Sequence, residues 1–196
     1  MASPSSFLDL TASKLLDELG GPVAPGGGSA LAFTVAMAAA VVRMAARASA
    51  ESWDAAGGIA AQADALRARA APLAQLDADV YDRALAIRDG AAALPPEKRD
   101  WEIGRAFVAA AEPPLEIARV AADVAELARE VAGAGEPRVR ADAVAAATLA
   151  AAAARAAVSL VEANLTALEG DARVAEAEEL ALAAEHSAAR ARRAGS

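Results

Sequence analysis

One segment of the sequence has the residue types that a ligand site near a backbone would need. It is a run of proline, three glycines and serine, Pro25-Gly26-Gly27-Gly28-Ser29, followed by an apolar stretch. Glycines let a ligand approach the main chain closely, and Gly28 or Ser29 can begin a helix whose first amide groups point into the loop. Such a helix start can bind an anion. The segment lacks the Gly-Lys-Ser/Thr of a nucleotide phosphate loop, so the alternative is a tight turn between two packed helices.

A second group of polar residues falls on one face of an expected helix. Asp77, Tyr81, Ala84 and Arg88 follow one another at intervals of four, three and four residues. Side chains at these intervals form one stripe on a helix. An acid, a phenol and a guanidinium on one face can form a pocket wall. The alternative is an ordinary amphipathic face with an ion-pair network, and the neighbouring acids Asp79 and Asp82 are expected in solvent.

Several other polar residues occur within or beside apolar segments. They are Arg43, Asp142, Arg155 and Asn164. Because an unpaired charge is costly among apolar groups, each is expected to have a partner, a ligand or access to a water-filled cleft. A structural ion pair between helices is the alternative for each of them.

The elements that must position these residues are predicted to be helices. Glycine and proline positions divide the chain into expected helices with the approximate ranges 6–19, 29–50, 58–89, 96–111, 113–133, 138–168 and 171–193. Pro72 is expected to kink the third helix or to divide it in two. The second helix is apolar nearly all round as far as Arg43, which predicts a place at the centre of a bundle.

Composition supports one all-α domain covering residues 1–196, a bundle of six to seven helices. Alanine dominates the sequence and only 3% of the residues are aromatic, which favours helix almost everywhere. Alanine buries little area, so a core made from it depends on close approach of the helices over long contacts. A second subunit would bury more of this surface, and we therefore expect a homodimer.

Composition also excludes several classes of function. The chain has no cysteine and one histidine, which argues against disulfides, thiolate chemistry and a histidine or cysteine metal site. A net charge of −8 without a basic patch argues against nucleic acid as a partner. The uncharged run from Gly20 to Val42 contains prolines and glycines in its first half, which argues against a membrane span. The N-terminal residues lack the pattern of a signal peptide, so we expect a cytoplasmic protein.

The order of the motifs resembles the cyclodeaminase/cyclohydrolase family of tetrahydrofolate enzymes. The proline and triple-glycine block is the specific part of the likeness, which covers roughly residues 5–170. The matching segments are Phe7-Leu8, Pro22–Ala30, Leu76–Tyr81, Leu94-Pro95, Pro114–Ala118, Gly135–Pro137, Ala141–Ala143 and Asn164-Leu165. The chain departs from the family pattern at Pro96, Glu136 and Ala141, where the family commonly has lysine, asparagine and serine.

The resemblance implies an enzyme acting on the one-carbon bridge between N5 and N10 of tetrahydrofolate. It would either cyclise 5-formiminotetrahydrofolate with release of ammonia or hydrolyse 5,10-methenyltetrahydrofolate to 10-formyltetrahydrofolate. The resemblance implies no metal and no cofactor beyond the folate substrate. The competing hypotheses are a non-catalytic folate-binding protein and a helical scaffold that binds a partner through the charged segment 171–193.

The resemblance also suggests roles for the polar residues. The catalytic carboxylate would be Asp77 or Asp142, and Tyr81 would donate a proton. The substrate's carboxylates would bind at the helix start that follows Pro25, together with Arg43 or Arg88. Asn164 would be a further substrate-binding residue.

Overall fold

The computed structural model describes residues 6–22, 25–166 and 170–194. Within these ranges all regular structure is helical, so the expected all-α class is confirmed. The helices are α1 (Ala12–Leu19), α2 (Gly27–Ala48), α3 (Ala56–Ala70), α4 (Leu73–Gly90), α5 (Pro96–Ala134), α6 (Arg140–Asn164) and α7 (Ala172–Arg193). Short 3-10 helices cover Phe7–Asp9, Ala91–Ala93 and Pro137–Val139.

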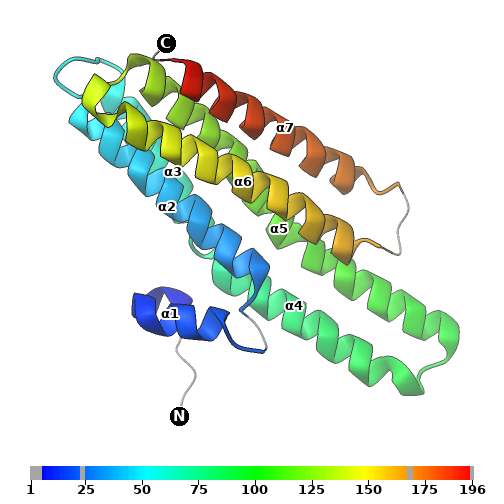
Figure 1. Cartoon of the computed structure of the whole chain (residues 1–196). Coiled ribbons are helices and arrows are strands. Elements are labelled where there is room, and N and C mark those ends of the chain that lie inside the picture. The colour runs from blue at the N-terminus through cyan, green and yellow to red at the C-terminus, as the bar shows by residue number, and fades with distance from the viewer. Residues whose placement is uncertain (1–5, 23–24, 167–169, 195–196) are drawn as a thin grey trace.

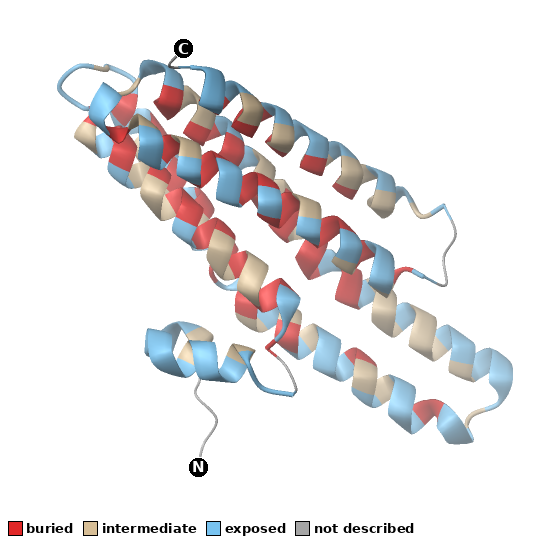
Figure 2. Cartoon of the chain, in the orientation of Figure 1, coloured by how far each residue is buried: buried red, intermediate tan, exposed pale blue. Residues whose placement is uncertain are grey.

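The long helices form a bundle around one core made largely of alanine. Helices α2, α5, α6 and α7 run along a common long axis (Figure 1). Helix α4 and the first half of α5 form a hairpin that extends beyond the bundle. Buried residues gather where these helices face one another, while the far end of the hairpin is mostly exposed (Figure 2). The largest buried side chains, Leu115 and Ile117 among them, come mainly from α5. Alanine elsewhere lets the helix axes approach closely, which compensates for its small side chain.

The prolines act differently at the two places where the sequence predicts a break. Pro72 divides the expected third helix into α3 and α4. The prediction that Pro113 and Pro114 separate two helices is wrong, because both lie inside the continuous helix α5. A proline removes the N–H that would bind the carbonyl four residues earlier. For Pro114 that carbonyl belongs to Ala110, and the side-chain amide of Asn164 donates to it at 2.9 Å.

The remaining helix ends lie close to their expected places. In place of the first expected helix there is a short 3-10 helix followed by α1. The side chain of Ser6 caps the 3-10 helix, and the side chain of Thr11 caps α1. Asp171 caps α7 by accepting from the backbone N–H of Arg173 at 3.0 Å, and the pKa of its carboxyl is lowered to about 2 by the Arg173 guanidinium. Residues 167–168, expected in the sixth helix, lie outside the described ranges.

Two segments are long and apolar enough to cross a membrane by length and composition. They are α2 and the segment Pro137–Asn164. Half of each apolar stretch is buried against other helices of the bundle, as in the core helices of soluble proteins. The length and composition of these two segments are therefore only weak support for a membrane span.

Candidate functional site

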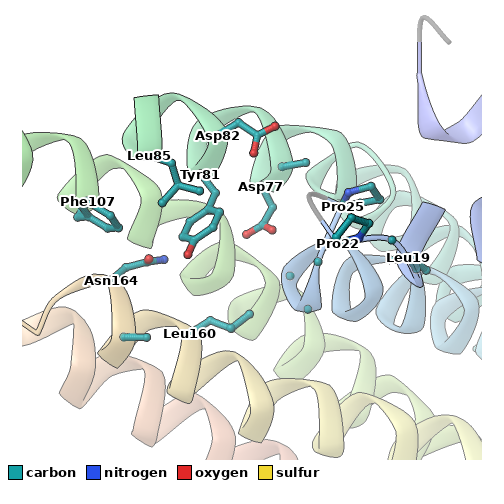
Figure 3. A pocket seen from close by; sticks show the side chains of 16 residues that line it. Leu19, Pro22, Pro25, Asp77, Tyr81, Asp82, Leu85, Phe107, Leu160 and Asn164 are labelled. Carbon is teal, nitrogen blue, oxygen red and sulfur yellow. The ribbon is translucent and has the colours of Figure 1, made fainter. Parts of the chain in front are cut away.

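A pocket of about 610 Å³ lies where the α4–α5 hairpin leaves the bundle. Its walls come from the end of α1, the loop before α2, the first residues of α2, the middle of α4, one residue of α5 and the end of α6 (Figure 3). The volume is in the range of small-molecule sites. Seven of the candidate residues line it: Pro25, Gly26, Gly27, Gly28, Asp77, Tyr81 and Asn164.

The carboxylate of Asp77 lies directly against the start of α2. A Cβ atom added at Gly28 would overlap this carboxylate, so only glycine leaves room for it. The backbone N–H of Ser29 donates to Asp77. The first turn of α2 therefore receives a carboxylate of this chain. The expectation that it binds a carboxylate of the substrate stays a prediction.

Burial changes the acidity of Asp77. The carboxyl is half-buried between α2 and α4, and loss of hydration raises its pKa from an ordinary value of 3.8 to about 6. The hydrogen bond from Ser29 acts in the opposite direction but is the smaller effect. Near neutral pH such a group is mostly ionised and can still take up a proton readily.

Ser29 supports this arrangement from behind the pocket. Its side chain is fully buried, and its hydroxyl donates to the carbonyl oxygen of Ala74 at 2.6 Å. The bond ties the first turn of α2 to the first turn of α4, three residues before Asp77. Ser29 therefore positions the two helices and does not line the pocket.

Tyr81 lies one helical turn beyond Asp77 on the same wall. The phenol and the carboxylate point into the same space between α4 and α6 (Figure 3). The ring of Tyr81 packs edge to face on Phe107 of α5, with ring centroids 6.4 Å apart. This contact holds the ring, and the residue as a whole is 40% exposed.

Asn164 closes the opposite side of the pocket. Its bond to Ala110 fixes the amide at the point where Pro114 leaves a helix carbonyl without a backbone donor. Leu160, one turn earlier on α6, faces the loop and would be 3.8 Å from a Cβ at Gly27. The pocket thus has its acidic side chains on α4, while α6 contributes the apolar Leu160 and Ala163 and the neutral amide of Asn164.

Three candidate residues lie away from this pocket. Arg43 is 16 residues along α2 from Gly27, or about 24 Å, and contacts Asp64 of α3 at 3.5 Å. Arg88 pairs with the adjacent Asp89 at 2.9 Å, near the end of α4. Asp142 is exposed in the first turn of α6, a helix whose last turn carries Asn164. The chain therefore brings Asp77 and Tyr81 together with the glycine loop but not with these three.

The pocket also contains residues that the sequence pattern does not place in a site. Asp82, which the sequence places in solvent, is exposed but lies at the rim of the pocket. Leu85 follows Tyr81 by four residues, so the same periodicity could have found it. No sequence signal pointed to Phe107 or Leu160, because α5 and α6 meet α4 only through the fold.

The three departures from the family pattern lie outside the pocket lining. Pro96 is the first residue of α5, and Ala141 is exposed at the start of α6. Glu136 belongs to a loop at the other end of the bundle, where its side chain accepts from the hydroxyl of Ser52. Its backbone N–H donates to the hydroxyl of Ser49 at 2.9 Å. None of the three touches the described walls of the pocket.

Comparisons with known proteins identify the fold and the family of the chain. A family model described as formiminotransferase-cyclodeaminase matches residues 11–183. The crystal structure of formiminotetrahydrofolate cyclodeaminase from Thermotoga maritima superposes with a TM-score of 0.84 at 22% sequence identity, over 95% of this chain and 96% of that one. No curated protein sequence matches the chain. Because the family match covers most of the sequence, the chain belongs to the formiminotransferase-cyclodeaminase family, as a helical domain of the cyclodeaminase type.

Proposed function

We propose that the chain is an enzyme that acts on the one-carbon bridge of tetrahydrofolate, with its reacting centre at Asp77. The reaction it would catalyse is cyclisation of 5-formiminotetrahydrofolate to 5,10-methenyltetrahydrofolate with release of ammonia. The observation that carries this proposal is the half-buried carboxylate of Asp77, which faces a pocket of about 610 Å³ and has a pKa of about 6.

The chemistry needs a negative group beside a cationic carbon centre. N10 attacks the amidine carbon, a tetrahedral carbon flanked by nitrogens forms, and the C–N bond to ammonia breaks. The carboxylate of Asp77 would stabilise the positive charge of the amidinium and accept the proton that N10 loses. Tyr81, whose hydroxyl faces the same space, would deliver a proton to the leaving nitrogen.

The same site would support hydrolysis of the methenyl bridge as a second reaction. A base with a pKa of about 6 can take a proton from water as water adds to the methenyl carbon. The C–N5 bond of the tetrahedral adduct then breaks, N5 takes up the proton that the hydroxyl loses, and 10-formyltetrahydrofolate is formed. Neither reaction changes the oxidation level of the carbon. We therefore propose that no redox cofactor takes part. The reacting carbon already belongs to a cation, so it needs no metal to polarise it, and we propose that folate is the only small-molecule partner.

Absorbance of the methenyl bridge tests the proposal, because the two reactions change it in opposite directions. Purified protein should increase the signal with 5-formiminotetrahydrofolate or decrease it with 5,10-methenyltetrahydrofolate. Asp77→Asn should lower turnover by roughly a hundredfold or more, while folate affinity changes much less. Asp142→Asn is the matched control, since that carboxylate is exposed at the other end of α6. A loss in the control and none in Asp77→Asn would move the reacting centre to the start of α6.

We also propose that two copies of the chain associate. Helix α1 has eight residues and none of them is buried, although isolated helices of this length are unstable in water. Helix α2 exposes Met37 and Met44. A second copy that covers both helices would explain these exposed apolar groups.

A further inference from the structure

A second hollow adjoins the pocket that contains Asp77. It has a volume of about 340 Å³ and lies between the first half of α5 and the end of α6. The two hollows share Phe107, Ala163 and Asn164, so they meet at this part of the wall. Figure 3 shows Phe107 and Asn164 at the side of the pocket away from the glycine loop.

The two hollows differ in chemical character. The first has Asp77 and Asp82 in its walls, and no lysine or arginine lines it among the described residues. The second is bounded mainly by apolar side chains and backbone of α5 and α6, such as Ile103 and Leu165. Its one acid, Asp100, is paired with Arg99 at 2.9 Å. Like charges in the first hollow would repel a ligand's carboxylates, whereas the second suits an uncharged ring.

The substrate of the proposed reaction has two parts, which extend from the reacting carbon in different directions. N5 belongs to the reduced pterin, and N10 carries the p-aminobenzoyl ring with its glutamate. If the reacting carbon lies beside Asp77 and Tyr81, the aryl ring must leave that space along one of its walls. The shared wall at Phe107 and Asn164 opens toward a hollow of suitable size and polarity.

We infer that the second hollow is the binding site of the p-aminobenzoyl group, with the pterin held in the first hollow. The inference rests on the proposed function, and it assigns a role in substrate positioning to the face of α5 that carries Asp100, Ile103, Gly104 and Phe107. These residues follow one another at intervals of three, one and three, so they share one side of the helix.

Gly104 allows the second hollow to be filled without disturbing the bundle. A Cβ atom added there meets no heavy atom within 4 Å, and the residue lies inside a helix where leucine is well accommodated. Leucine at this position would project from the wall into the hollow. Gly133 offers a matched control, because it is an exposed glycine of the same helix with equally open surroundings.

The experiment compares two ligands by calorimetry with the whole chain. One is tetrahydrofolate, and the other is a tetrahydropterin without the p-aminobenzoylglutamate. Gly104→Leu should weaken tetrahydrofolate binding by roughly tenfold or more, as expected when a ring-sized apolar group is excluded from its pocket. It should leave tetrahydropterin binding unchanged. Gly104→Ala should have a smaller effect of the same kind, and Gly133→Leu should change neither.

Each contrary outcome has a distinct meaning. Unchanged tetrahydrofolate binding in Gly104→Leu would overturn the assignment of the second hollow while the folate function stands. An equal loss of both ligands would also overturn it, because the substitution would then act on the pterin pocket. Failure of the unaltered protein to bind or turn over any folate would instead overturn the proposed function, and this inference with it.

Discussion

The burial of Asp77 leads to a prediction about stability, because removing the charge should stabilise the fold at neutral pH. The carboxyl has a pKa of about 6 in the folded chain and an ordinary value near 3.8 when hydrated. A rise from 3.8 to about 6 corresponds to about 3 kcal/mol, at about 1.4 kcal/mol per pH unit. That is the upper range of what Asp77→Asn should add to the free energy of unfolding when the carboxyl is ionised.

The sign of the pH dependence follows from proton binding. Between pH 3.8 and about 6 the folded chain binds more protons at Asp77 than the unfolded chain does. The contribution of this group to stability therefore falls as the pH rises through that window. Asp77→Asn should be up to about 3 kcal/mol more stable than the unaltered protein at pH 8 and equally stable at pH 3.5.

Urea denaturation followed by circular dichroism at several pH values measures this difference. Asp82→Asn is the control on the same helix, because Asp82 is exposed at the pocket rim, and we expect a change within about 0.5 kcal/mol. The more stable Asp77→Asn should also be the less active protein, as expected for a strained catalytic group. A stability gain that is the same at pH 3.5 and pH 8, or no gain at either, would show that folding does not raise the pKa of Asp77.

Two further predictions concern the packing around the site, and a third concerns the association of two copies. Gly28→Ala should lower turnover by tenfold or more, because the added Cβ overlaps the Asp77 carboxylate. Gly27→Ala, whose Cβ makes only an ordinary contact, should keep the parental rate in the same assay. Asn164→Ala should destabilise the fold by about 1–3 kcal/mol in urea denaturation, because the carbonyl of Ala110 loses its donor. Light scattering at micromolar concentration should give the mass of a dimer. The mass of a monomer at every micromolar protein concentration measured would contradict the association of two copies.

Much of the fold could be read from local features of the sequence. Alanine-rich segments separated by glycine and proline predict helices, and the ends of α2 and α7 lie within two residues of the expected positions. The glycine loop and the intervals of Asp77 and Tyr81 also pointed to the residues that line one pocket. These features are local: backbone freedom at glycine, capping groups and the helical period act over a few residues.

Other features depend on contacts between residues far apart in the chain. The continuity of α5 through Pro113 and Pro114 could not be predicted, because it depends on packing and on a donor from Asn164, about fifty residues away. The contact between the Asp77 carboxylate and the start of α2 could not be predicted either, since only the packing of α4 on α2 brings Asp77 to Gly28. The sequence by itself determined that the chain is helical almost throughout and which polar groups are candidates for chemistry. Tertiary structure decided which of those groups meet, because burial and hydrogen bonding across the bundle depend on helix packing and not on sequence distance.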